Sequence, residues 1–246
     1  MNNLLLTKIY QRLCDEVDRL GFSWPVSFTY NPLRYAWDGF AQYMRYSEGK
    51  KRAVFLGINP GPWGMTQTGI PFGEVNAVRE FLGITKINII PSDEFHVSRP
   101  VKGLDCERSE VSGKRLWGLF RERFGTAEEF FKDNFVLNYC PLLFTAKNEK
   151  GGFRNLTPDK LVPSERQALC KICDEALAEA VKILRPEFVV GIGNFAYSCA
   201  ESALRFSLGY TPVITKILHP SPANPLANKN WAENTAHQLI EEGVWQ

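Results

Sequence analysis

The sequence predicts an α/β fold, with three layers (α/β/α) around a central, mainly parallel four-stranded sheet. Four short apolar runs, at residues 53–58, 135–138, 188–193 and 213–218, have the length and composition of buried strands. Stretches with helical spacing lie between them, and short strands that alternate with helices form parallel sheets covered on both faces. A length of 246 residues fits one domain with a substantial core, so we expect a single catalytic unit over residues 1–246.

The expected helices follow from apolar spacing and from capping residues. Residues 4–20 place apolar side chains such as Ile9 and Leu13 on one face. Thr126 and Glu129 have the spacing of a capping box and predict a helix start. The complete set of expected helices is 4–20, one opening at 73–74 and running to 81, 114–124, one starting after Thr126, 163–184, 194–205 and 228–241. Residues 91–113 are polar and irregular, and their pattern predicts no element.

Two loops rich in Pro and Asn follow two of the predicted strands. The first covers residues 57–74 and reads GINPGPWGMTQTGIPFGE, and the second covers residues 219–225 and reads HPSPANP. In open α/β sheets, ligands bind where loops leave the carboxyl ends of the strands. We therefore expect Asn59 and His219 to face one crevice, although they lie far apart in the sequence.

Composition narrows the class of protein. Hydrophobic residues make up 44% and charged residues 23%, as in ordinary soluble domains, and no apolar run approaches a membrane span of about 20 residues. The N-terminus lacks the pattern of a signal peptide, which predicts an intracellular protein (in the cytoplasm if bacterial, in the nucleus if eukaryotic). A net charge of +2 does not by itself indicate a nucleic-acid binder. The basic cluster of Lys114, Arg115, Arg121 and Arg123 fits phosphate contacts and a solvated helix surface equally well.

The cysteine pattern favours free thiols over a metal site. Cys170 and Cys173 form a Cys-x-x-Cys pair, but the pair lies inside an expected long helix and no second close pair exists. Ligation of an iron–sulfur cluster needs four thiolates. We therefore expect no metal and no cofactor.

Both loops resemble the single-strand-selective monofunctional uracil-DNA glycosylases, a branch of the uracil-DNA glycosylase superfamily. The first matches that family's Gly-hydrophobe-Asn-Pro-Gly-Pro motif and its extension, and the second matches His-Pro-Ser-Pro-x-Asn-Pro. A third match is LNYCPL at residues 137–142, so the resemblance spans residues 57–231. It implies a uracil-DNA glycosylase-like fold and a monomer that excises uracil from single- and double-stranded DNA without cutting the strand.

The resemblance assigns catalytic roles to His219 and Asn59. His219 would donate a hydrogen bond to O2 of the departing base, best as a neutral imidazole, a form that the unperturbed His pKa of about 6.5 allows near pH 7. Asn59 cannot act as a true base, but its amide oxygen can orient the attacking water. The alternatives are a histidine satisfied by backbone groups at a helix entry and an Asn that shapes a turn beside Pro60.

The resemblance also assigns a pocket for the base. The Asn138 amide can donate to O4 and accept from N3–H of uracil, and Phe72 would stack on the flipped base. Gly61 would leave room for water and for a polar group at ring position five, as in 5-hydroxymethyluracil; deaminated purines such as xanthine are candidate minor substrates. Ile58 and Met65 complete the expected pocket. The alternatives are a strand-ending Asn, an ordinary core Phe and a glycine needed only for backbone geometry.

The loop after His219 is expected to enter the DNA. Its expected DNA-binding residues are Pro220, Ser221, Pro222, Ala223, Asn224 and Lys229. The family often carries a large basic residue where this chain has Ala223, which predicts weak wedging in a duplex. Neither Lys216 nor Lys229 occupies a motif position for Schiff-base chemistry, so the chemistry should be monofunctional.

Two other functional classes remain open at this point. A catalytically idle module of the same fold would bind damaged DNA without releasing a base. A hydrolase or transferase acting on free nucleotides would use a glycine-rich phosphate turn, for which residues 191–194 (GIGN) are a weak candidate.

Overall fold

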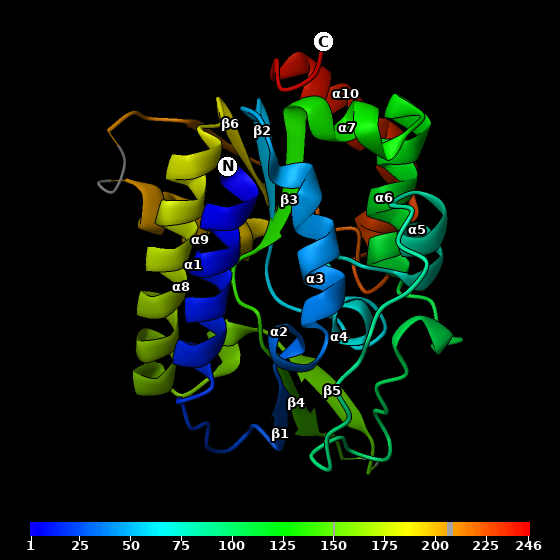
Figure 1. Cartoon of the computed structure of the whole chain (residues 1–246), viewed down its shortest axis with the longest axis vertical. Helices are drawn as coiled ribbons and strands as arrows, with labels where there is room; N and C mark the ends of the chain where they lie inside the picture. The colour runs from blue at the N-terminus through cyan, green and yellow to red at the C-terminus, as the bar shows by residue number, and fades with distance from the viewer. Residues whose placement is uncertain (150, 206–208) are drawn as a thin grey trace.

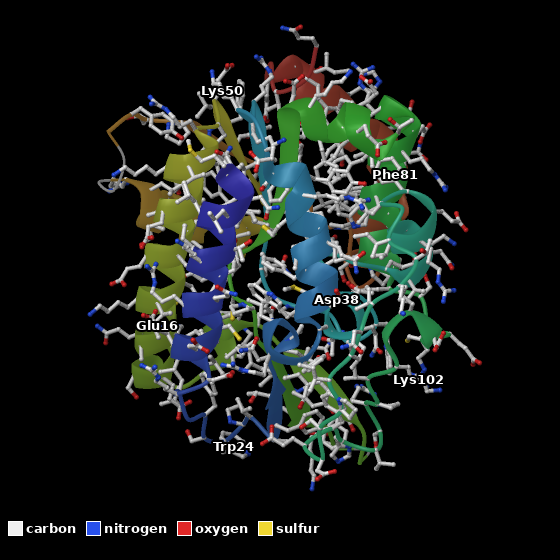
Figure 2. The ribbon with its side chains drawn as sticks, in the orientation of Figure 1. Glu16, Trp24, Asp38, Lys50, Phe81 and Lys102 are labelled. Carbon is white, nitrogen blue, oxygen red and sulfur yellow. The ribbon has the colours of Figure 1, made fainter. Side chains whose placement is uncertain are left out.

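The computed structural model describes residues 1–149, 151–205 and 209–246, and it contains two sheets. A four-stranded parallel sheet lies in the upper half of the view in Figure 1, and a three-stranded antiparallel sheet lies below it. Figure 2 gives the same orientation with side chains: Lys50, just before the first parallel strand, lies at the upper end, and Trp24 lies at the lower end. The carboxyl ends of the parallel strands therefore point toward the small sheet.

The parallel sheet confirms the predicted fold class. Its strands are β2 (Ala53–Gly57), β3 (Asn134–Asn138), β6 (Phe188–Ile192) and β7 (Val213–Ile217), in the order β3-β2-β6-β7. The first three strands are almost fully buried, whereas β7 is a partly exposed edge strand. Gly57 is the register partner of Asn138, so the loops that leave β2 and β3 begin side by side.

Helices cover both faces of this sheet, as the alternating pattern predicts (Figure 1). On one side α1 (Asn2–Val17), α8 (Pro163–Leu184) and α9 (Asn194–Leu204) pack together. The other side carries α5 (Val75–Glu80), α6 (Val111–Phe124), α7 (Ala127–Asp133) and α10 (Trp231–Glu241), and α3 (Trp37–Met44) lies in front. The helix at 163–184 has the bounds that the sequence predicts. Thr126 caps α7 as predicted, because its side chain accepts from the Glu129 N–H.

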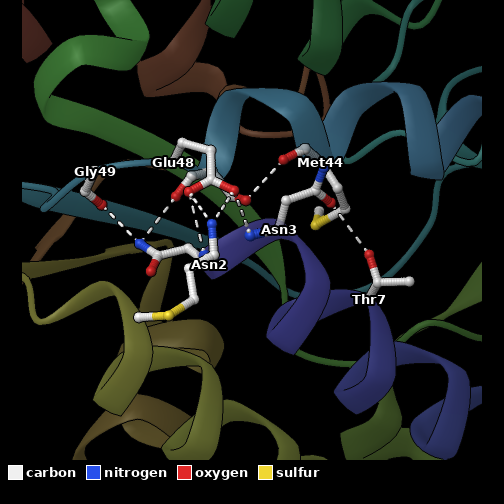
Figure 3. Close-up of polar contacts among 8 residues, drawn as sticks. Asn2, Asn3, Thr7, Met44, Glu48 and Gly49 are labelled. Carbon is white, nitrogen blue, oxygen red and sulfur yellow. Dashed lines mark hydrogen bonds and ion pairs between the residues drawn. The ribbon is translucent and has the colours of Figure 1, made fainter.

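The first helix is shifted relative to its prediction, since it spans Asn2–Val17 and not residues 4–20. Figure 3 shows the reason for the early start: the Glu48 carboxylate accepts hydrogen bonds from the N–H groups of Asn2 and Asn3, at 3.2 and 3.1 Å. A carboxylate at this end satisfies free N–H groups and complements the helix dipole. The Asn2 side chain also donates to the Gly49 carbonyl, so the start of α1 is fixed beside the chain that enters β2.

The small antiparallel sheet is absent from the sequence prediction. It consists of β1 (Phe28–Tyr30), β4 (Leu143–Lys147) and β5 (Phe153–Leu156), in the order β1-β4-β5. β4 continues the apolar stretch that follows β3, and β1 has only three residues, so neither produces a separate periodic signal. The small sheet also contacts the loop after β2, because the carbonyl of Leu156 at the end of β5 accepts a hydrogen bond from the Asn59 side chain in that loop.

Several shorter elements complete the chain. They are α2 (Pro32–Tyr35), α4 (Met65–Thr68) and the 3-10 turns Arg45–Ser47, Gly103–Asp105, Pro158–Lys160 and Pro225–Asn228. The helix predicted at 228–241 is present and ends as predicted, but it starts later. A 3-10 turn occupies Pro225–Asn228, and α10 starts at Trp231, because Asn230 adopts the left-handed conformation (φ 47°). Within residues 1–149, 151–205 and 209–246, none of the helices is both long and apolar enough to cross a bilayer.

Candidate active site

A cleft of about 370 Å³ opens at the carboxyl ends of the parallel strands, on the side of the small sheet. Seven of the expected functional residues line it, contributed by the loops after β2 and β7 and by the last residue of β3. They are Ile58, Asn59, Gly61, Phe72, Asn138, His219 and Ser221. The cleft is completed by residues that the sequence analysis did not single out: Pro60, Pro62, Glu110, Ser112, Asn155, Leu156 and Thr157. The expected crevice therefore exists, and it contains both Asn59 and His219.

Asn59 is held by its amide nitrogen. Its Nδ2 donates to the carbonyl of Leu142 at 3.1 Å and to the carbonyl of Leu156 at 3.2 Å. A side-chain amide has two N–H donors and one carbonyl acceptor. Because both donors are engaged, the orientation of the side chain is fixed and Oδ1 remains the group that can accept a hydrogen bond from water.

His219 is fixed as a hydrogen-bond donor. Its Nδ1 accepts from the backbone N–H of Ser221 at 3.1 Å. Burial lowers the pKa of His219 to about 4, so the ring is neutral near pH 7. In a neutral imidazole whose Nδ1 is the acceptor, the proton resides on Nε2. The ring therefore offers an Nε2–H donor without a positive charge.

Asn138 carries an acceptor that has no partner. The side chain is 7% exposed, and its Nδ2 donates to Sδ of Met65 at 3.2 Å. Among the described residues, no group donates to its buried Oδ1. An unsatisfied buried acceptor costs free energy of about 1–3 kcal/mol, which a ligand with an N–H group would recover. Asn138 is therefore prepared to accept one hydrogen bond and to donate another.

Phe72 forms a wall of the cleft in a strained backbone conformation. Its φ is 53°, which is unusual for a residue with a bulky side chain. Its carbonyl accepts from Nε1 of Trp117 at 3.1 Å and from the N–H of Glu74, which stabilise this conformation. Its ring lies 6.1 Å from that of His219. Strained residues of this kind cluster at functional sites, and this one presents a flat aromatic surface to the cleft.

Gly57 explains how Phe72 and Asn138 approach each other. A Cβ at this position would lie 2.2 Å from Oδ1 of Asn138 and 2.5 Å from the Phe72 ring. Any larger residue at the end of β2 would separate the aromatic wall from the amide. Met65 is buried behind Asn138 and is not among the lining residues, so the structure places it as a support for the amide and not on the cleft wall.

Glu110 is the main lining residue that sequence reasoning missed. It is the N-cap residue of α6, and the backbone N–H groups of Trp63 and Gly64 lie near its carboxylate. Burial raises the pKa of this carboxyl to about 7, the two N–H groups counteract the shift, and Glu74 adds to it. A polar segment without periodicity carries Glu110, so the sequence alone gave no signal for it.

Comparison with known proteins places the chain in a family. The model of the uracil DNA glycosylase superfamily matches residues 44–240. This protein belongs to the uracil-DNA glycosylase superfamily. The single-strand selective monofunctional uracil-DNA glycosylase of Rattus norvegicus is 47% identical over 236 residues, which cover 95% of this chain and 82% of the rat protein. The resemblance inferred from the two loops is thereby confirmed.

Two further relatives and one solved structure agree. The single-strand selective monofunctional uracil DNA glycosylases of Mus musculus and Bos taurus are each 46% identical, over 95% of this chain and over 82% and 84% of their own lengths. A crystal structure of wild-type SMUG2 from Pedobacter heparinus is similar with a TM-score of 0.62, covering 97% of this chain and 95% of that chain. Its sequence identity is 17%, so this likeness supports the fold alone.

The loop after His219 borders the cleft through Ser221. Arg115 of α6 fastens it, donating to the carbonyl of Pro220 at 3.1 Å and to Oδ1 of Asn228 at 2.9 Å. Pro222, Ala223 and Lys229 are exposed, whereas Pro220 is buried and Asn224 is partly exposed and caps the 3-10 turn through Leu226 N–H. Apart from Ser221, the expected DNA-binding residues of this loop lie outside the cleft lining. Leu226 is 69% exposed and is the large apolar side chain that this loop presents to solvent.

The predicted basic cluster lines a different and larger hollow. Lys114, Arg115, Arg121 and Arg123 border a hollow of about 1240 Å³ between α6 and α10. None of the expected catalytic or base-binding residues reaches it. One member of the cluster, Arg115, is engaged in fastening the loop after His219.

None of the residues that line the cleft is a cysteine. All six are free thiols, and Cys173 is buried within α8. In the part of the chain that the structure describes, no group of three or more His, Cys, Asp or Glu side chains is arranged to hold a metal ion.

Proposed function

We propose that this protein releases uracil from DNA by hydrolysing the bond between the base and its deoxyribose. The observation that carries the proposal is the convergence of three polar groups in one cleft: an oriented Oδ1 on Asn59, an unpartnered Oδ1 on Asn138 and an Nε2–H donor on His219. The family assignment supports the same reaction, and the relatives' names describe it as monofunctional and selective for single strands.

The reaction begins with a base turned out of the DNA stack, because the target bond cannot be reached inside a duplex. The Phe72 ring offers a stacking surface that recovers part of the cost of unstacking. Asn138 accepts from N3–H and donates to O4, a pattern that uracil matches. Cytosine presents the reverse pattern, with an acceptor at N3 and a donor at C4, so the fixed amide discriminates against it.

Bond cleavage places negative charge on the departing base and positive charge on the sugar. The Nε2–H of His219 donates to O2 as that charge develops, and donors placed in this way stabilise a transition state by about 2.7–4 kcal/mol. Asn59 holds the water that captures the sugar cation, by accepting one of its hydrogen bonds through Oδ1. Since an amide cannot remove a proton, cleavage runs ahead of water attack. The products are free uracil and an uncut strand with an abasic site.

The loop from Pro220 to Asn224, together with Lys229, contacts the DNA around the flipped nucleotide. The proposal extends to uracils with a small polar group at ring position five, such as 5-hydroxymethyluracil, because Gly61 brings no side chain into the cleft. Xanthine is a candidate for a slower side reaction. We further propose that residues 1–246 act as a single catalytic domain and as a monomer.

A base-release assay tests the proposal. The protein is incubated with an oligonucleotide that contains one uracil, in the presence of a chelator, and free uracil and strand length are measured before and after alkali. We expect uracil release at full rate and an intact strand until alkali is added. Binding without release would favour an idle binding module, and release from deoxyuridine alone would favour an enzyme of free nucleotides.

A further inference from the structure

A single peptide unit connects the Arg115 side chain to His219. The guanidinium of Arg115 donates to the carbonyl of Pro220 at 3.1 Å, and the N–H of Ser221 donates to Nδ1 of His219 at 3.1 Å. That carbonyl and that N–H belong to the same planar peptide group. The group is trans, so its carbonyl and its N–H point in opposite directions. Arg115 therefore holds one side of the peptide group whose other side faces the imidazole.

Asn228 extends this contact to a second carbonyl of the same loop. Its Oδ1 accepts from Nη2 of Arg115 at 2.9 Å, and its Nδ2 donates to the carbonyl of Pro222 at 3.0 Å. The carbonyls of Pro220 and Pro222 lie on either side of Ser221 in the chain. The guanidinium and the amide thus form a clamp, the Arg115–Asn228 clamp, around the N–H group that the imidazole accepts.

The clamp starts from a firmly packed part of the fold. Arg115 lies near the start of α6, and the next two residues of that helix, Leu116 and Trp117, are almost fully buried. Ser112, one turn earlier on α6, lines the cleft. In contrast, Ala223 at the tip of the clamped loop is exposed. An exposed loop is therefore tied to a helix that also contributes to the wall of the cleft.

The peptide group decides which ring nitrogen of His219 carries the proton. A neutral imidazole exists in two tautomers, and the partner of one nitrogen selects between them. The Ser221 N–H can only donate, so Nδ1 accepts and Nε2 keeps the proton. A cationic donor on the carbonyl of the same peptide group strengthens this N–H as a donor, because hydrogen bonds in a chain polarise one another. Without Arg115, the peptide group would be freer to rotate and its N–H would be a weaker donor.

We propose that Arg115, together with Asn228, is a positioning residue for base release, which fixes the orientation and the tautomer of His219 through the peptide group after Pro220. This step rests on the proposed function, in which Nε2–H of His219 donates to O2 of the departing base. Neither member of the clamp lines the cleft, so both act through the loop and not on the base. The role also differs from a phosphate contact, the other use for a cation of this basic cluster.

The first test reads the tautomer of His219 by NMR of isotope-labelled histidine in the protein without DNA. The spectrum of His219→Ala identifies its signals among those of the three histidines. We expect the Nε2–H form in the wild type and a measurable share of the Nδ1–H form in Arg115→Met, which keeps the length of the side chain and removes its donors. Lys114→Met removes the neighbouring exposed cation of α6 and should keep the wild-type tautomer. An unchanged tautomer in Arg115→Met would overturn the inference, whatever the protein does to uracil.

The second test measures single-turnover release of uracil from a single strand at saturating enzyme. Small misplacements of a catalytic group are costly, so Arg115→Met should lower the rate by roughly tenfold to a hundredfold. In a His219→Ala background, the same substitution should lower the remaining rate by less than about twofold, because the group that Arg115 positions is gone. Asn228→Ala removes an exposed side chain, so it should fold normally and show a smaller loss with the same dependence on His219.

The two backgrounds separate positioning from DNA binding. An equal loss of rate from Arg115→Met with and without His219 would overturn the inference, because Arg115 would then act on the strand independently of the imidazole. No loss in the wild-type background would also overturn it. A wild-type protein that released no uracil would contradict the proposed function instead, and the tautomer measurement would still test the action of Arg115 on His219.

Discussion

Replacement of Gly61 by alanine should destabilise the protein through Glu110. The backbone of Gly61 lies outside the left-handed region, so alanine carries no conformational penalty there. The added Cβ would lie 2.0 Å from Oε2, 2.5 Å from Cδ and 2.8 Å from Oε1 of Glu110, whereas ordinary contact begins at 3.4 Å. The carboxyl must therefore retreat by more than 1 Å, away from the nearby N–H groups of Trp63 and Gly64, which favour its charged form.

The size of the effect follows from two costs. Overpacking of a closely packed site costs about 1–3 kcal/mol, and a buried N–H group without an acceptor costs about 1–3 kcal/mol. Because the carboxyl is the end of a flexible side chain, part of each cost is relieved by rotation. We expect Gly61→Ala to lower the free energy of unfolding by about 2 kcal/mol, which corresponds to a fall in Tm of roughly 4–8 °C for a protein of this size.

A double-mutant cycle measured by thermal and urea unfolding checks this reasoning. In a Glu110→Ala background the space beside Gly61 is empty, so Gly61→Ala should cost less than about 0.5 kcal/mol. An equal loss of stability in both backgrounds would refute the argument, because the cost would then come from the backbone of the NPGP loop. Gly118→Ala is a suitable control, since no atom lies within 4 Å of a Cβ built on that glycine.

Three further predictions concern catalysis and DNA. His219→Ala should lower the single-turnover rate of uracil release by roughly a hundred- to a thousandfold. Asn59→Ala should also lower this rate, and both variants should largely keep DNA binding. Rates within a few-fold of wild type would contradict the catalytic roles of the two residues. Since the pKa of His219 is about 4, the rate should not fall as the pH drops through 6.5. The Glu110 carboxyl has a pKa of about 7 and Glu74 as its charged neighbour, so its ionisation should slow uracil release as the pH rises through 7, because its charge opposes the developing base anion. Glu110→Gln should remove that inflection from the pH–rate profile. A profile that is the same in Glu110→Gln and wild type would contradict this role of Glu110. Ala223→Arg should raise the ratio of duplex to single-strand activity at fixed salt, and Leu226→Ala should lower it if this exposed side chain fills the gap left by the flipped base.

The parallel sheet and its flanking helices could be predicted because their signals are local. β2, β3 and β6 are continuous apolar runs, and α8 begins at a proline and keeps its apolar spacing to its end. The small antiparallel sheet gives weaker signals, because β1 is short and β5 is half exposed. The last helix was placed too early because the sequence pattern does not show that Asn230 adopts a left-handed conformation.

The site was predictable in its residues and not in their arrangement. The motifs indicated Asn59, Asn138 and His219 from the family resemblance. The contacts that orient them come from distant segments: the carbonyl of Leu156 fixes Asn59, and Met65 supports Asn138. Glu110 lies in a stretch without periodicity, and only the close approach of two glycines in the folded chain reveals its position. Such partners depend on tertiary contacts, which a local pattern does not encode.

The most direct test of the central claim is the selectivity set by Asn138. Free uracil and free cytosine are measured after incubation of wild-type protein and of Asn138→Ala with matched single strands that differ in one base. The amide is held with one unpartnered acceptor and one remaining donor, so the wild type should release uracil and no cytosine. Asn138→Ala should lose most of the uracil release while it still binds the strand. Release of both bases by the wild type, or unchanged release of uracil by Asn138→Ala, would contradict the account.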